Sequence, residues 1–315
     1  MAEALPEFAP MLAMAQAAPP PDLSMPTDQL RAMSDAGVMA MHAFVRPAGP
    51  MTATDACVGD VPVRIYRPEG VASPAPVHIH VHGGGWFMGS IETVDPMSRE
   101  LASAGAMVVV SVGYRLAPEH RWPTAPEDVY AVLQWVHDEA GALDVDPMSI
   151  SIGGESAGGN LAACVALMTR DRNGPPLVAQ WLDVPGVDLT VPETESHRAY
   201  GKGYGLDMDL VRECLDWYVD ADDRQNPYAS PALADDLEGL APAIVTTAEL
   251  DPLRDQGEAY AARLEAAGVP VILRRTTGHL HATTWLTAFT PSAAEWHDEM
   301  VAALRDLHAR ATVSR

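Results

Sequence analysis

From Val61 onwards, strand patterns alternate with helix patterns, and this alternation restricts the fold more than any other feature of the sequence. Helix patterns follow Thr124 and Pro291, and others cover Ala157 to about Arg170 and Arg254–Ala267. Short apolar, β-branched runs predict strands over Val61–Tyr66, Val77–Val81, Met107–Val112, Ser149–Gly153, Val178–Val184, Ala243–Ala248 and Val269–Arg275. This order predicts an α/β fold whose central sheet is mostly parallel and covered by helices on both faces.

Two segments lie outside the alternation. Residues 1–50 are rich in Ala, Pro and Met, and eight of the 15 methionines fall within residues 1–51. Residues from about 190 to 226 contain a Gly-rich stretch and an acidic, aromatic helix pattern around Leu210–Val219. A flexible methionine face suits a mobile lid over an apolar cleft, although plain helix packing accounts equally well for any one methionine. We therefore expect a main domain at 51–315 with an insertion at about 190–226, preceded by a separate N-terminal segment at 1–50.

Length and charge exclude several classes of protein. The 315 residues are 48% hydrophobic, which is enough for a large domain with a sizeable core. A formal charge of −23 repels phosphate groups, which argues against nucleic acid and anionic membrane surfaces as partners. No apolar run reaches the roughly 20 residues of a membrane-spanning helix. The N-terminal stretch also lacks the Lys or Arg with which a signal peptide begins, so the sequence predicts a cytoplasmic protein without membrane insertion.

Gly154-Glu-Ser156-Ala-Gly158 matches the pattern G-x-S-x-G and lies between a predicted strand and a predicted helix. This is the context of a nucleophile elbow, in which small flanking residues allow a tight turn that exposes the serine Oγ above the sheet. The alternative is a glycine-rich turn without a catalytic role. We take Ser156 as the candidate nucleophile.

His82-Gly83-Gly84-Gly85 ends the predicted strand Val77–Val81. A glycine run at that place lets backbone N–H groups face a developing oxyanion without side chains in between. The candidate donors are the N–H groups of Gly84, Gly85 and Ala157, the last being the residue after the nucleophile. A phosphate-binding loop is the competing use, but the chain contains neither GxGxxG nor GxxxxGK.

A serine nucleophile needs a histidine base and an acid that orients it. Where the serine lies on a nucleophile elbow, the chain order is Ser, acid, His. Asp251 follows the predicted strand Ala243–Ala248 and is the candidate acid, with Glu249 and Asp255 as rivals. His279 and His281 both follow the next strand, and their positions alone leave either of them as the base.

Four stretches of the chain together are similar to a known family. They are Val81-His-Gly-Gly-Gly-Trp86, Tyr114-Arg-Leu-Ala-Pro-Glu-His120, Gly154-Glu-Ser-Ala-Gly-Gly-Asn160 and Ala248-Glu-Leu-Asp-Pro-Leu-Arg-Asp255. With them the chain resembles, over nearly its whole length, the bacterial relatives of hormone-sensitive lipase among the α/β-hydrolases. The resemblance implies Asp251 as the triad acid, His281 as the base, and a two-part helical cap formed by residues 1–50 and about 190–226.

The chain departs from the family pattern in three places. Ala282-Thr283 replaces the usual Gly-Phe after the histidine, Glu155 replaces the more usual aspartate before the serine, and Trp86 stands where a smaller aromatic is common. None of these changes removes a reacting group. The loss of the aromatic after His281 alters the wall beside the base, so the substrate preference of the family does not carry over.

The sequence thus predicts a serine carboxylesterase that hydrolyses short- to medium-chain esters through an acyl-enzyme on Ser156. A deacetylase or peptidase on the same triad and a non-catalytic small-molecule receptor are the alternatives. No cofactor is expected. His78, His80 and His82 share one strand face but lack a carboxylate or cysteine at metal-site spacing, so no metal is expected either. The partner is a small-molecule ester, and a homodimer is an option for the assembly.

Overall fold

The computed structural model describes residues 3–19, 22 and 25–313, and within these ranges it has one eight-stranded sheet. Neighbouring strands pair in the order β1 (Met51–Val58), β2 (Val61–Pro68), β4 (Val108–Val112), β3 (Ala75–Val81), β5 (Val145–Glu155), β6 (Ala179–Asp183), β7 (Ala243–Leu250) and β8 (Val271–Leu280). β2 pairs antiparallel with β1 and β4, whereas all pairs from β4 to β8 are parallel. The predicted mostly parallel α/β architecture is confirmed.

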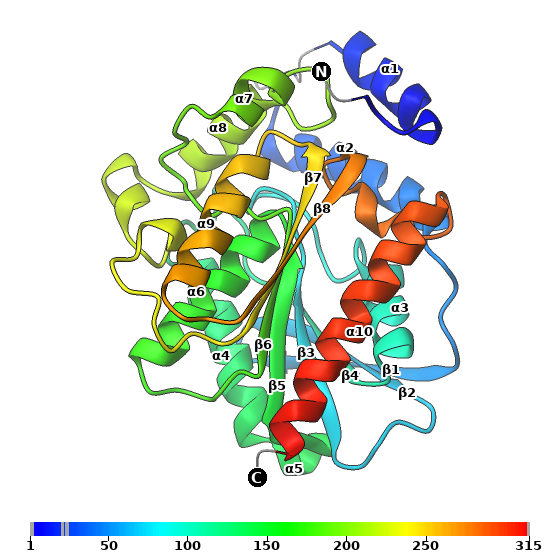
Figure 1. Ribbon diagram of the computed structural model, residues 1–315, viewed down its shortest axis with the longest axis vertical. Coiled ribbons are helices and arrows are strands. Elements are labelled where there is room, and N and C mark those ends of the chain that lie inside the picture. The colour runs from blue at the N-terminus through cyan, green and yellow to red at the C-terminus, as the bar shows by residue number, and fades with distance from the viewer. Residues whose placement is uncertain (1–2, 20–21, 23–24, 314–315) are drawn as a thin grey trace.

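Helices cover both faces of the sheet (Figure 1). α4 (Thr124–Asp138), α6 (Ala157–Asp171) and α9 (Arg254–Ala266) pack on one face, and α3 (Asp95–Gly105) and α10 (Pro291–Val313) pack on the other. The short α5 (Ala140–Leu143) precedes β5. At the top of Figure 1, above the carboxyl ends of the parallel strands, lie α1 (Ala9–Ala17), α2 (Thr27–Ala40), α7 (Glu195–Tyr200) and α8 (Met208–Tyr218). None of the helices in the described ranges is long and apolar enough to cross a bilayer.

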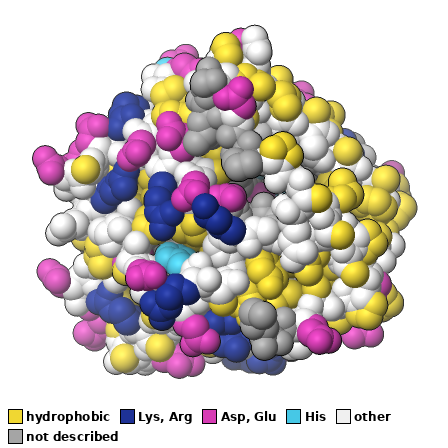
Figure 2. All heavy atoms as spheres, turned by 90° about the horizontal axis from the view of Figure 1, so that it is seen from above, with side chains coloured by type: hydrophobic (Ala, Val, Ile, Leu, Met, Phe, Trp, Pro, Cys, Tyr) yellow, Lys and Arg dark blue, Asp and Glu magenta, His cyan; other side chains and the backbone are white. Residues whose placement is uncertain are grey.

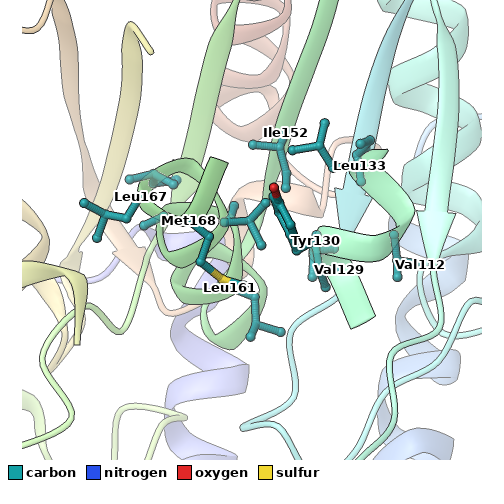
Figure 3. Packing of buried hydrophobic residues seen from close by; sticks show 14 of the residues in the cluster. Val112, Val129, Tyr130, Leu133, Ile152, Leu161, Leu167 and Met168 are labelled. Atoms are coloured by element: carbon teal, nitrogen blue, oxygen red, sulfur yellow. The ribbon is translucent and has the colours of Figure 1, made fainter. Parts of the chain in front are cut away.

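The larger core lies between the sheet and the helices α4, α6 and α9. Strand residues such as Val112 and Ile152 meet the inward faces of two helices, namely Val129, Tyr130 and Leu133 of α4 and Leu161, Leu167 and Met168 of α6 (Figure 3). A parallel sheet is covered on both faces, and strands such as β4 and β6 are accordingly buried along their whole length. Because the strands from β4 to β8 are parallel, their carboxyl ends lie at the same edge of the sheet. This edge carries the candidate site.

Some elements differ from those expected. The edge strand β1 and the helix α3 were not predicted, and β8 continues past the expected end at Arg275 to Leu280. β1 pairs only with β2 and leaves most of its side chains exposed or half-exposed, so it lacks the apolar signature of a buried strand. Residues 1–50 form α1 and α2, and the helix pattern around Leu210–Val219 forms α8, whereas the short α7 was not predicted. The short 3₁₀ turns Pro6–Phe8, Met41–Phe44 and Ala221–Gln225 lie beside these helices in the sequence.

Candidate active site

Ser156 occupies the sharp turn between β5 and α6. Its φ of 56° and ψ of −116° lie in a region that non-glycine residues rarely adopt, so the backbone is strained there. The N–H of Ser156 donates to the carbonyl oxygen of Asp183 over 2.8 Å. A Cβ on Gly154 or on Gly158 would overlap the carbonyl oxygen of Val81. The two glycines of the motif are therefore required because β5 and α6 approach β3 closely.

The structure brings Ser156, His281 and Asp251 into one hydrogen-bonded chain. Nε2 of His281 lies 3.0 Å from Oγ of Ser156, and Nδ1 of His281 lies 2.8 Å from Oδ2 of Asp251. Asp251 is fully buried, and its other oxygen accepts the N–H of Leu253 over 2.8 Å. Since a carboxylate only accepts, it holds the histidine proton on Nδ1 and leaves Nε2 to accept the serine proton.

The two rival acids have other partners. Glu249 accepts the N–H of Gly278 over 2.8 Å, and Asp255 accepts the N–H of Ser196 over 2.8 Å and pairs with Arg254. Neither carboxylate is bonded to His281. Asp251 alone among the three candidates lies in the hydrogen-bonded chain with Ser156.

The two candidate bases lie in different surroundings. His279 belongs to the end of β8, where its ring nitrogens lie 3.0 Å from the hydroxyl of Thr283 and 2.9 Å from that of Ser292. Burial lowers the pKa of His279 to about 4. Burial also acts to lower the pKa of His281, but the charge and hydrogen bond of Asp251 outweigh it and raise the pKa above its ordinary value. His281 is thus the histidine that Ser156 meets.

The predicted oxyanion donors lie around the same serine. Gly84 and Gly85 have φ values of 108° and 58°, which favour glycine, and a Cβ on Gly84 would clash with the backbone of Met88. Ala157 begins α6, where the first N–H groups of a helix have no partner within the helix. All three residues line the cavity into which Ser156 opens. Gly84, Gly85 and Ala157 thus share a cavity with Ser156, and backbone N–H groups beside a nucleophile are the kind of donor that can stabilise a developing oxyanion.

Two carboxylates near the elbow were not assigned a role from the sequence. Oε1 of Glu155 accepts the N–H of Gly83 over 2.7 Å and so ties the glycine loop to the residue before the nucleophile. Asp183 lies buried under the elbow, where it accepts the hydroxyls of Thr246 and Thr284 over 2.5 and 3.0 Å. Burial raises the pKa of Asp183 to about 7. A charged residue at the end of the apolar run Val178–Val184 was the signal that could have revealed it.

Each histidine of the predicted strand face has a nearby partner within the protein. In each of the three, Nδ1 lies 2.8 Å from its partner. The partner is the hydroxyl of Ser151 for His78, the hydroxyl of Ser98 for His80, and the carbonyl oxygen of Gly83 for His82. The His82 ring also stacks on Tyr114, with the ring centres 4.2 Å apart. These histidines pack the sheet face and support the glycine loop.

Two of the three departures from the family pattern, at Thr283 and Trp86, are buried residues with contacts of their own. Thr283 is buried, and its hydroxyl donates to the carbonyl oxygen of Leu280 over 2.8 Å, so it stabilises the turn that carries His281. Trp86 stacks on Tyr218 of α8 with the ring centres 4.7 Å apart. Ser156 and His281 remain at the wall of the cavity in the presence of these changes.

The cavity above Ser156 has a volume of about 540 Å³. Its walls are mostly apolar, and they come from the glycine loop, the α2 region, α8 and the turn after β8. Seen from above, this end of the molecule mixes arginine and carboxylate side chains on the left, whereas hydrophobic side chains gather on the right (Figure 2). Exposed methionines of the N-terminal helices include Met14, Met33 and Met39. With its apolar walls and with Ser156 and His281 among its lining residues, the site is an apolar pocket with a few convergent polar groups, as small-molecule sites usually are.

Comparison with known proteins agrees with this geometry. Residues 78–284 match a family model described as the alpha/beta hydrolase fold. The carboxylesterase NlhH of Mycobacterium tuberculosis is 43% identical over 258 residues, which cover 79% of this chain and 80% of the relative. An arylesterase of Saccharolobus solfataricus is 47% identical over 225 residues, covering 71% and 72% of the two chains.

Solved structures extend the similarity to nearly the whole chain. The hyperthermophilic esterase from the archaeon Pyrobaculum calidifontis superimposes with a TM-score of 0.90 at 36% identity, covering 97% of this chain and 99% of that one. The thermostable carboxylesterase EstE1, cloned from a metagenomic library, gives a TM-score of 0.86 at 37% identity and covers 91% and 99% of the chains. The family expected from the sequence is confirmed: the chain belongs to the hormone-sensitive lipase-like carboxylesterases of the α/β-hydrolase fold.

Proposed function

We propose that this protein is a serine carboxylesterase that hydrolyses short- to medium-chain carboxylic esters through an acyl-enzyme on Ser156. The observation that carries the proposal is the hydrogen-bonded chain from Ser156 through His281 to Asp251, with the serine facing an apolar cavity. Family membership supports the ester-hydrolase class. A receptor that had lost catalysis would not need this complete chain, and no feature of the cavity favours an amide over an ester.

The reaction follows from the positions of the groups. Oγ of Ser156 attacks the ester carbonyl carbon while Nε2 of His281 takes the serine proton, and the carbonyl oxygen becomes an oxyanion. The N–H groups of Gly84, Gly85 and Ala157 stabilise that oxyanion. His281 then gives its proton to the departing alkoxide, which leaves as the alcohol. Water attacks the acyl-enzyme by the same route, so that the acid is released and Ser156 regains its proton.

We assign residues 1–50 and about 190–226 to a two-part cap over the substrate cavity. Side chains from both segments line the cavity, for example Val38 and Met41 from the first and Met208 and Val211 from the second. A volume of about 540 Å³ holds a small ester, and the apolar walls suit alkyl or aryl groups. This enclosure supports short- to medium-chain substrates. A cytoplasmic location and a homodimer stay predictions that rest on the sequence.

The test is the Ser156→Ala variant assayed on nitrophenyl acetate and butyrate. We expect kcat to fall by about 10⁴-fold or more, because the loss of the nucleophile costs nearly as much as the loss of the whole triad. A fluorophosphonate should label the wild type at Ser156 and leave the variant unlabelled, while the unfolding temperature stays close to that of the wild type. Turnover by the alanine variant near the wild-type rate would disprove the assignment.

A further inference from the structure

Helix α2 is bonded directly to the loop that carries two of the predicted oxyanion donors, Gly84 and Gly85. Nε of Arg31 donates to the carbonyl oxygen of Phe87 over 2.6 Å. The N–H of Gly89 donates to Oδ1 of Asp35 over 2.9 Å. Arg31 and Asp35 are four residues apart and so share one face of α2. Two side chains of the N-terminal segment thereby hold the far end of the glycine loop.

The stretch from Phe87 to Gly89, which α2 holds, determines the direction of one predicted oxyanion donor, the N–H of Gly85. The carbonyl oxygen of Gly84 accepts the N–H groups of Phe87 and Met88, over 3.2 and 3.1 Å. That carbonyl shares a planar peptide unit with the N–H of Gly85, so fixing the carbonyl also fixes the N–H. The near end of the loop is held separately, by the bond from the N–H of Gly83 to Glu155. Movement of Phe87 would therefore rotate the Gly85 donor away from the serine.

Arg31 joins this loop to a second segment. Its Nη2 donates to the carbonyl oxygen of Ala117 over 3.0 Å, and the N–H of Ala117 donates in turn to the carbonyl oxygen of Trp86 over 2.9 Å. The guanidinium also pairs with Glu119 through both carboxylate oxygens. The Arg31 side chain is 22% exposed, whereas that of Glu119 is 51% exposed. The bonds to the carbonyl oxygens are thus more sheltered from water than the ion pair.

We propose that Arg31 and Asp35 are positioning residues for the oxyanion hole, so that the N-terminal segment contributes to the chemical step as well as enclosing the substrate. The proposal rests on the proposed esterase function. A segment that only encloses substrate would change KM and the preference for acyl-chain length. A segment that aligns an oxyanion donor changes kcat by the same factor for every ester, because every ester develops the same oxyanion.

The experiment compares Arg31→Met and Asp35→Ala with the wild type on nitrophenyl acetate and hexanoate. Methionine keeps the aliphatic stem of Arg31 and removes its donors. Loss of a complete oxyanion donor costs about 10²–10³ in kcat, so misalignment of one donor should lower kcat about 10-fold. We expect this factor for both esters, with KM within about twofold and an unshifted pH profile. The rate of phosphonylation of Ser156 should fall in parallel.

Three further variants separate alignment from folding. Asp35→Asn keeps an acceptor for the N–H of Gly89 and should restore kcat, even if Asp35→Ala lowers the unfolding temperature. Glu119→Gln removes only the exposed ion pair and should cost less than about threefold, as expected of a surface pair. Met33→Ala changes a residue of the same helix that is 62% exposed and should match the wild type.

The outcomes distinguish the inference from the proposed function. Wild-type protein without activity on these esters would disprove the proposed esterase function. An active wild type with unchanged kcat in Arg31→Met and Asp35→Ala would overturn only the positioning role. A rise in KM restricted to hexanoate would also overturn it, because enclosure alone would then explain α2. A parallel loss of kcat on both esters, recovered in Asp35→Asn, supports it.

Discussion

His279 and His281 are two residues apart, yet their surroundings move their pKa values in opposite directions. Burial without a charged hydrogen-bond partner lowers the pKa of His279, whereas His281 faces the carboxylate of Asp251, which raises its pKa. The left-handed conformation of Ala282, with φ of 58°, turns the chain immediately after His281. The turn that follows the strand and the position of Asp251 thus decide which imidazole can serve as the base.

This difference predicts the acid limb of the pH–rate profile. In the proposed mechanism only neutral His281 accepts the serine proton, so kcat/KM should rise with pH through a pKa above 6.5. Nitrophenyl acetate hydrolysis between about pH 4 and 9 measures it. An acid limb near pH 4 would indicate His279 instead, because its pKa is about 4. As a control, Asp251→Asn should lower kcat by about 10⁴-fold.

The sequence predicts the helices and strands that follow from local pattern and misses the features that depend on tertiary contact. Parallel strands such as β4 and β7 are buried along nearly their whole length, begin with apolar, β-branched runs, and were predicted nearly in full. Strand β1 was missed because an exposed edge imposes no apolar pattern. Ser156 could be singled out as a candidate because its tight turn demands glycines, whereas His279 and His281 both follow the predicted strand Val269–Arg275, and their positions alone left the base open. The bonds of Arg31 and Asp35 join distant segments, and no spacing in the sequence reveals them.

A substitution at the elbow can test how closely α6 approaches β3. Gly158→Ala should place a Cβ on the carbonyl oxygen of Val81, force α6 outward and lower both activity and the unfolding temperature, at a cost of several kcal/mol. Gly141→Ala is the matched control, since a Cβ there meets nothing within 4 Å. It should be neutral or stabilise by up to about 1 kcal/mol. Thermal unfolding measures both, and equal unfolding temperatures would contradict the close approach.

Acidification has two opposing effects on the stability of the folded protein. The formal charge of −23 repels itself, and protonation of carboxylates towards the pI of about 4.6 relieves that repulsion. Several buried histidines have the opposite effect, because they lower the stability of the folded protein as the pH falls. His279 and His308 have pKa values of about 4, and burial also lowers the pKa of His78, His82 and His297. Salt screens the surface repulsion but leaves the buried rings unaffected.

In high salt, therefore, we expect the protein to lose stability as the pH falls below about 6.5. The unfolded chain binds protons at its histidines near pH 6.5, whereas the folded protein keeps His279 and His308 neutral down to about pH 4. Each of these two histidines should cost about 2 kcal/mol between about pH 7.5 and pH 5. Thermal unfolding of the wild type and of His308→Gln measures the effect. Glutamine can still bond to the hydroxyls of Ser149 and Ser151 that His308 contacts, but it does not titrate. The variant should lose less stability on acidification than the wild type, and an unchanged dependence on pH would show that His308 takes up its proton in the folded protein.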